Sequence, residues 1–263
     1  MRSALWLPLF DELADPIVLT RLAVEAEEAG WDGVFVWDHV NWHGLAVADA
    51  WIALAAIAGA TSTIRLGPMV TPLPRRRPAK VARETATLDR LSGGRLVLGV
   101  GLGSDRFGSE FSALGEETDD RRRAGMLDES LAILAAAWSG EPVHHHGEHF
   151  TVDGMQFRPT PADRIPVWAA GFPGKVKPMR RAAALDGFFP VNLAETDQLA
   201  AVTATLAELR SGRPDPYDIA VALPADADVP AFAKAGATWW LAEFDHEHTS
   251  AADVRAVLRN GPA

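Results

Sequence analysis

The sequence predicts a (β/α)₈ barrel, an α/β fold of the TIM-barrel type. Short apolar runs recur eight times, and most are followed by a stretch whose apolar residues have helical spacing. The length of 263 residues is close to the ~250 typical of one such barrel. Active sites of these barrels lie at the carboxyl ends of the strands, so the residues after each run are the first candidates. The predicted strands are 3–7, 33–37, 64–70, 96–100, 166–170, 187–191, 219–223 and 238–242.

Apolar residues three and four positions apart predict the helices between these strands. Gly30 ends the first helix. Pro78 opens a later one that runs to about Leu91, and Gly93-Gly94 ends it. The other apolar faces, in chain order, are Leu19, Leu22, Ala23 and Ala26; Leu127, Leu131, Leu134 and Trp138; Leu199, Val202, Leu206 and Leu209; and Val254, Val257 and Leu258.

The interval between the fourth and fifth predicted strands is much longer than the others. It holds one helix and two insertions, at about residues 104–120 and 142–161, and the second reads as a short hairpin. Because no linker-like tract divides the chain, we predict one domain over residues 1–263. An open doubly wound sheet also alternates strands and helices, but no Gly-x-Gly-x-x-Gly turn follows the first strand, which favours the closed barrel.

Composition restricts the possible partners. The formal net charge is −10, which argues against a nucleic-acid backbone or an anionic membrane as the main partner, although Arg75-Arg76-Arg77 is a local exception. There are no cysteines, so disulfides and thiolate chemistry are excluded. No signal-peptide layout and no run long enough to span a membrane are found, and we expect a cytoplasmic protein.

The second predicted strand ends in Asp38-His39. A histidine at the mouth of a barrel can exchange protons near neutral pH, and Asp38 could orient it. The alternative is structural: Asp38 caps the next turn, and His39 is a polar residue with ordinary hydrogen bonds. The position at a strand end favours the catalytic interpretation.

Two further strand ends have an unusual backbone composition. Pro68, Pro72 and Pro74 near the end of the third strand remove ladder donors and could press the main chain against a flat ligand. The fourth strand leaves through Gly101-Leu102-Gly103-Ser104, which lets backbone N–H groups approach an anion. Rigid or tight strand exits without a ligand explain both patterns equally well.

A glycine-rich turn after the fifth predicted strand leads into a helix. Gly171-Phe172-Pro173-Gly174-Lys175 resembles a phosphate-binding arrangement, with Lys175 as an added charge. Simple helix initiation is the alternative. Trp6, Trp37 and Trp42 lie at or near strand ends and could line a substrate pocket, whereas we expect the tryptophans at 168, 239 and 240 to pack within strands.

Two other enzyme classes find little support. The histidines at 144–146 and 149 suggest a metal, but adjacent histidines on a hairpin point in alternate directions, and no helical His-x-x-x-His motif is present. We therefore predict no metal site. Gly-x-Ser-x-Gly, the signature of serine hydrolases of the α/β class, is absent as well.

Taken together, these segments resemble the bacterial luciferase-like superfamily of flavin- and deazaflavin-dependent oxidoreductases. Besides Asp38-His39, the segments that carry the resemblance are 66–72 (LGPMVTP), 88–95 (LDRLSGGR), 98–103 (LGVGLG) and 165–168 (IPVW). The run 88–103 is the most specific. The resemblance extends from about residue 1 to 192.

The resemblance implies FMN or coenzyme F420 at the carboxyl-end mouth of the barrel. It implies a cis non-proline peptide on the third strand behind the ring system, which we place at Pro68-Met69, with Val70 and Thr71 beside it. It also implies that the cofactor phosphate lies at Gly101, Gly103 and Ser104 and at Gly171, Phe172, Gly174 and Lys175. The family's histidine at the position of His39 carries a proton in F420-dependent members.

One departure limits this transfer. Some F420 dehydrogenases have a glutamate just after the fourth-strand glycines, where this chain has Ser104, so a sugar-phosphate dehydrogenase is doubtful. The chain is also short for the family, which predicts a more open substrate pocket. A homodimer is expected from the resemblance alone.

We therefore predict an oxidoreductase that acts on a small organic substrate, by hydride transfer or by monooxygenation. The Asp38-His39 pair favours F420 over FMN; an FMN enzyme would need a flavin reductase as a partner. His39 would move a proton, Asp38 would orient it, and Trp6 and Trp42 would line the substrate pocket. A flavin-binding protein without turnover and a metal-dependent barrel hydrolase are the alternatives.

Overall fold

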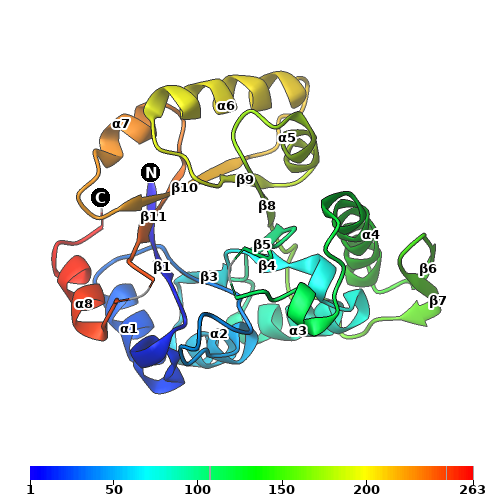
Figure 1. Cartoon of the computed structure of the whole chain (residues 1–263), viewed down its shortest axis with the longest axis horizontal. Helices are drawn as coiled ribbons and strands as arrows, with labels where there is room; N and C mark the ends of the chain where they lie inside the picture. The colour runs from blue at the N-terminus through cyan, green and yellow to red at the C-terminus, as the bar shows by residue number, and fades with distance from the viewer. Residues whose placement is uncertain (107, 247, 263) are drawn as a thin grey trace.

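The computed structural model describes residues 1–106, 108–246 and 248–262, and it is a barrel (Figure 1). Nine short parallel strands form one sheet in the order β3-β2-β1-β11-β10-β9-β8-β5-β4. Their bounds are β1 (Arg2–Leu7), β2 (Gly33–Val36), β3 (Arg65–Pro68), β4 (Thr71–Pro72), β5 (Leu98–Gly101), β8 (Val167–Gly171), β9 (Gly187–Pro190), β10 (Asp218–Pro224) and β11 (Trp239–Glu243).

The predicted (β/α)₈ barrel is confirmed, with one difference in its third strand. The predicted run 64–70 contains only β3, which ends at Pro68, and a separate strand β4 follows at Thr71–Pro72, outside the predicted bounds. These two strands stand at the two ends of the strand order. A parallel bridge between Leu66 and Leu96 joins the two sides of this break. The other seven predicted strands agree with the structure to within two residues at each end.

Helices form a ring around the sheet, and polar side chains fix where several of them begin. Asp15, Asp49, Asp119 and Ser250 cap α1, α2, α4 and α8 by accepting hydrogen bonds from backbone N–H groups of the first turn. The helix bounds are α1 (Pro16–Glu28), α2 (Ala50–Ala60), α3 (Pro78–Ser92), α4 (Asp120–Trp138), α5 (Val176–Ala183), α6 (Thr196–Leu209), α7 (Val229–Lys234) and α8 (Ala251–Arg259).

The glycines after α3 make a turn that other residues would resist. Gly93 has φ +68° and Gly94 has φ +84°, so both lie in the left-handed region. This turn leads directly into β5.

Side chains alternate between two apolar layers along each strand. One layer packs between strands and helices. The other, which we call the inner cluster, fills the barrel and consists of Ala4, Phe35, Met69, Val97, Trp168, Phe189, Ala220, Trp239 and Leu241. Trp168 and Trp239 therefore pack within the barrel as predicted, and Trp240 packs on the helix side.

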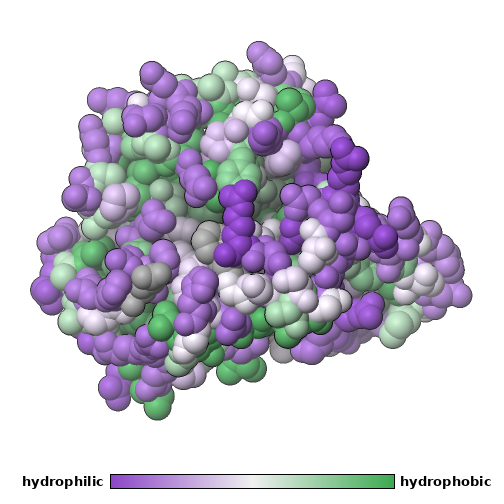
Figure 2. All heavy atoms as spheres, viewed as in Figure 1, coloured by the Kyte–Doolittle hydropathy of each residue, from purple (hydrophilic) through white to green (hydrophobic). Residues whose placement is uncertain are grey.

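The second insertion forms an antiparallel hairpin of β6 (Pro142–His146) and β7 (Thr151–Gln156). It projects from the barrel beside α4 (Figure 1), and mainly hydrophilic residues cover it (Figure 2). The first insertion contains the short 3₁₀ helix Ser112–Leu114. In the described ranges, none of the helices has the length and apolar composition that crossing a membrane requires.

Arg95 joins the end of α2 to the turn between α3 and β5. Its guanidinium is buried and donates to the carbonyl oxygens of Ala58 at 2.8 Å, Thr61 at 2.9 Å, Ile64 at 2.9 Å and Ser92 at 2.6 Å. A fifth bond goes to the Thr61 hydroxyl at 2.8 Å. One side chain thus satisfies carbonyls that would otherwise be unpaired inside the protein.

We expect Arg95→Ala to lower the free energy of unfolding by about 3 kcal/mol, because several buried carbonyl oxygens lose their donors. The corresponding fall in melting temperature is roughly 6–12 °C for a domain of this size. Calorimetry is the measurement. Arg21→Ala removes an exposed guanidinium on α1 and serves as the control. A loss no larger than that of the control would contradict this role of Arg95.

Candidate active site

The carboxyl ends of β1, β2, β4 and β5 bring the candidate residues together at one mouth of the barrel. Asp38 and His39 follow β2, and Thr71 lies in β4. Glu110 comes from the loop after β5 and is 3% exposed. Glu110 is not among the residues predicted from the sequence, because the loop that carries it has no periodicity to show which way it folds.

Glu110 holds His39. Its Oε2 lies 2.8 Å from Nδ1 of His39 and 2.9 Å from Nη1 of Arg75, while Oε1 accepts the backbone N–H groups of Val40 and Asn41. Burial alone would raise the pKa of Glu110, but the hydrogen bond from His39 and the charges of His39 and Arg75 outweigh it and lower the pKa to about 2. Glu110 is therefore ionised at neutral pH, and Nδ1 of His39 is the nitrogen that carries a proton toward it.

The expectation that Asp38 orients His39 is wrong. The Asp38 carboxylate is 4% exposed and is occupied by other groups: Arg76 Nη2 at 2.6 Å and Nε at 3.1 Å, and the Thr71 hydroxyl at 2.5 Å. Arg75 also donates to the Asp38 carbonyl oxygen at 3.0 Å. Asp38 thus ties the end of β2 to β4 and the arginines that follow, and Glu110 has the role expected of Asp38.

The break in the third strand contains a cis peptide bond between Met69 and Val70. The prediction of Pro68-Met69 was therefore one residue too early. The Met69 carbonyl oxygen accepts a 2.6 Å hydrogen bond from Nε1 of Trp6 on β1. Pro68 and Met69 are buried, and Val70 is half-buried.

Thr71 cannot contact a ligand in the mouth with its hydroxyl, because it is fully buried and donates that hydroxyl to Asp38. The floor of the mouth is apolar instead. It consists of partly buried side chains that rest on the inner cluster, namely Trp6, Val70, Ala170, Val191 and Ala222.

Trp42 is 2% exposed and lies behind His39, with ring centroids 4.6 Å apart. It stacks on Phe10 at 5.0 Å. Trp37 lies 4.9 Å from Trp6 between ring centroids and is half-buried. Trp6 and Trp37 are therefore the more accessible aromatic faces, while Trp42 supports the histidine.

The β5 glycines are required for close packing. A Cβ on Gly101 would lie 2.9 Å from Val70, and one on Gly103, which has φ +72°, would lie 2.5 Å from the Phe111 ring. Ser104 accepts a 3.2 Å hydrogen bond from the backbone N–H of Arg106. Tight packing accounts for both glycines without a ligand.

The turn after β8 is more open. Phe172 is 49% exposed, Gly174 has φ +75° with no atom close to its missing Cβ, and Lys175 is exposed at the start of α5. Gly171 is different, because a Cβ there would lie 2.5 Å from Pro178. Backbone N–H groups before α5 are thus free of crowding.

The hairpin histidines serve local contacts. His144 lies 3.2 Å from Asp153 across the hairpin, and His145 lies 3.1 Å from Glu129 on α4. Among the residues that the structure describes, no group of three or more histidines, aspartates or glutamates is arranged to hold a metal ion.

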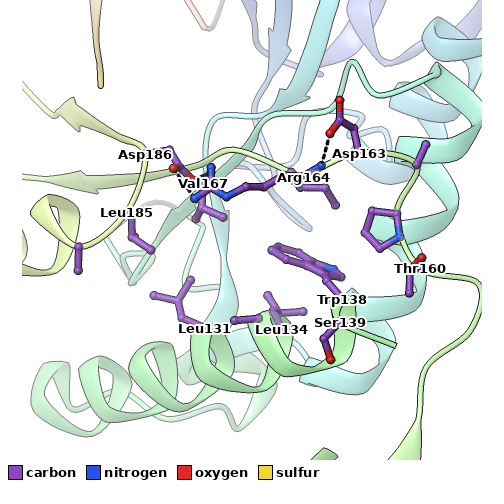
Figure 3. Close-up of a pocket in the computed structure, with 15 residues that line it drawn as sticks. Leu131, Leu134, Trp138, Ser139, Thr160, Asp163, Arg164, Val167, Leu185 and Asp186 are labelled. Atoms are coloured by element: carbon purple, nitrogen blue, oxygen red, sulfur yellow. Dashed lines mark hydrogen bonds and ion pairs between the residues drawn. The ribbon is translucent and has the colours of Figure 1, made fainter. Parts of the chain in front are cut away.

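A cavity of about 540 Å³ lies at the opposite, amino-terminal ends of β8 and β9, beside α4 (Figure 3). Trp138 and Leu134 form part of its apolar wall. Its charges neutralise one another: Arg164 pairs with Asp186 at 2.6 Å, and the Asp163 carboxylate accepts the Arg164 backbone N–H. None of the candidate residues at the mouth lines this cavity, so it is separate from the candidate active site.

The chain resembles known proteins in sequence and in fold. The model of a family described as luciferase-like monooxygenase matches residues 14–257. An F420-dependent glucose-6-phosphate dehydrogenase of Kineococcus radiotolerans is 34% identical over 181 residues, which are 66% of this chain and 52% of that protein. A dehydrogenase of the same name from Nakamurella multipartita is 35% identical over 178 residues, 66% of this chain and 51% of the relative. The chain thus spans about half the length of these curated relatives.

Solved structures extend the likeness in fold. An F420-dependent secondary alcohol dehydrogenase in complex with an F420-acetone adduct has a TM-score of 0.74 at 23% identity and covers 98% of this chain and 81% of its own. The FMN-bound oxygenating constituent of 3,6-diketocamphane monooxygenase from Pseudomonas putida has a TM-score of 0.72 at 22% identity, covering 85% and 67%. At these identities the match establishes the barrel fold alone.

The low pKa of Glu110 makes the stability of the fold depend on pH. Glu110 is more acidic in the folded chain than in the unfolded one, so it stabilises the fold above about pH 4.5, and this contribution is lost as the pH falls toward 2. We expect Glu110→Gln to cost about 2–3 kcal/mol of unfolding free energy at neutral pH and much less near pH 3. Urea denaturation at both pH values measures this, and Glu208→Gln on the outer surface of α6 is the control. An equal loss at both pH values would contradict the assignment.

Proposed function

This chain belongs to the luciferase-like monooxygenase family, and we propose that it is an oxidoreductase that uses coenzyme F420 to transfer a hydride to or from a small organic substrate. The observation that carries the proposal is the His39–Glu110 pair at the barrel mouth, 2.8 Å apart. The similarity to relatives that are named F420-dependent dehydrogenases supports it. A flavin-type cofactor is the broader part of the proposal, and F420 is the more specific part.

The residues at the mouth fit a flat ring system. The floor offers apolar, partly exposed side chains, and Ala170 and Ala222 are small enough to leave space above the inner cluster. Val70 would contact the ring at the break in the third strand. The open turn offers the exposed Lys175 side chain and the first-turn N–H groups of α5 for a phosphate, while the Lys175 N–H itself donates to the Phe172 carbonyl oxygen. When bound, F420 would supply hydride transfer, which no side chain can perform.

Side chains of the protein would transfer the proton that accompanies the hydride. Because Glu110 is ionised and engages Nδ1, the other ring nitrogen of His39, Nε2, is left to accept a proton from a substrate hydroxyl or to return one to a carbonyl oxygen. Glu110 also stabilises the positive charge that His39 gains in that step. Arg75, 2.9 Å from the same carboxylate, helps to keep Glu110 ionised.

Cofactor identity is tested by fluorescence titration of the purified protein with F420 and with FMN. We expect F420 to bind at least about tenfold more tightly, a difference of about 1.4 kcal/mol. Tighter binding of FMN would replace the proposal with an FMN-dependent monooxygenase, which is the second function that the family match supports. Binding of neither would overturn both.

We expect His39→Ala to slow hydride exchange with bound F420 by about 10²–10⁴-fold, because the proton loses its carrier, while the dissociation constant of F420 changes little. Stopped-flow absorbance of the bound cofactor, with panels of small alcohols and carbonyl compounds, measures the rate. His43→Ala, at an exposed position nearby, is the matched control. If the parent chain binds F420 but exchanges hydride with no member of the panels, it is a cofactor-binding protein without turnover.

A further inference from the structure

Glu243 places a carboxylate on the inner side of the barrel mouth. Along β11, Trp239 and Leu241 belong to the inner cluster, so the next inward position is Glu243. In register it lies beside Trp6 on β1 and Pro224 on β10. It is exposed in the open mouth, whereas the layers below it are buried.

The charge of Glu243 lacks the pairing that the other mouth carboxylates have. Asp38 is paired with Arg76, and Glu110 with Arg75 and His39. In the described part of the chain, no lysine or arginine forms an ion pair with Glu243. Desolvation by the surrounding protein raises the pKa of Glu243, and the charge of His246 only partly opposes this.

Aromatic faces flank this carboxylate. Trp6 is its neighbour on β1, Trp37 lies 4.9 Å from Trp6, and His246 stacks on Trp37 at 5.8 Å between ring centroids. Indole faces attract cations through the ring quadrupole, and most strongly where water is partly excluded. Because Trp37 already contacts Trp6 and His246, the indole that lies beside Glu243 is that of Trp6. A carboxylate beside an indole favours a cationic ligand and repels an anionic one.

We propose that the substrate carries an ammonium group, which binds Glu243 and the face of Trp6, some distance from the carbon that is oxidised or reduced. The proposal rests on the proposed function. His39 follows β2, and Glu243 ends β11 on the other side of β1. Trp37 lies 5.9 Å from His39 and 4.9 Å from Trp6 between ring centroids, so His39 and the proposed ammonium site border the same group of rings. Phosphate esters, such as the substrate named for the glucose-6-phosphate dehydrogenases, are disfavoured here.

Three matched probes test this selectivity: 4-fluorobenzylamine, 4-fluorobenzyl alcohol and 4-fluorobenzoate, which differ in charge but little in shape. Their dissociation constants are measured by fluorine NMR at neutral pH, with the protein alone and after addition of F420. We expect the amine to bind at least about tenfold more tightly than the alcohol, and the benzoate to bind most weakly. Equal affinities, or a preference for benzoate, would overturn the proposal.

Variants assign the effect to Glu243. Glu243→Gln keeps the shape and should bring the amine to the affinity of the alcohol, and Glu243→Lys should reverse the order of amine and benzoate. Glu208→Gln changes the net charge equally on the outer surface of α6 and should leave the preference unchanged. Melting temperatures show whether each variant is folded. A preference for the amine that survives in folded Glu243→Gln would refute the role of this residue.

The probe assay also separates this proposal from the proposed function. A Glu243-dependent preference in a protein that does not bind F420 would support the ammonium site and overturn the cofactor assignment. F420 binding without any preference among the probes would leave the cofactor assignment intact and overturn the ammonium site.

Discussion

The mouth of the barrel depends on neutralising buried negative charge. Asp38 and Glu110 are almost fully buried, and an isolated carboxylate in such a place would be costly. Ion pairs with Arg75 and Arg76 offset the cost of burying these carboxylates. Because the two arginines follow the third strand, their ion pairs fix the ends of β2, β4 and the loop after β5 relative to one another. The position of His39 follows from this network rather than from the strand that carries it.

The sequence was sufficient for the fold class and for most strand bounds, because the alternation of strands and helices follows local rules. The polar residues at strand ends lead to the same barrel mouth that the candidate site occupies. The carboxylate that pairs with His39 could not be predicted from the sequence. Glu110 lies 71 residues away in an irregular loop, and only the folded chain shows which carboxylate meets the histidine. Asp38, the neighbour in sequence, points elsewhere because two arginines and Thr71 compete for it.

The two ends of the barrel differ in how completely their polar groups are paired. At the amino-terminal end, Arg95 and the Arg164–Asp186 pair satisfy carbonyls and charges among themselves, as expected of a scaffold. At the mouth, Glu243 and the open turn before α5 keep polar groups that the described protein does not fully use. The fold of this chain is similar to that of an F420-dependent enzyme and to that of an FMN-bound one, so the fold by itself does not determine the cofactor.

The loop after β5 both borders the mouth and positions the histidine. Glu110 accepts from Val40 and Asn41, and Asn41 in turn donates to the Gly108 carbonyl oxygen at 3.0 Å. Hydrogen bonds thus connect the loop after β2 to the loop after β5 from both sides. Loops at a barrel mouth are usually the parts that evolution exchanges freely to recruit new substrates. A change in the loop after β5 would also displace the segment that carries His39, so the loops of the other half of the barrel are the parts that can be altered without moving the histidine.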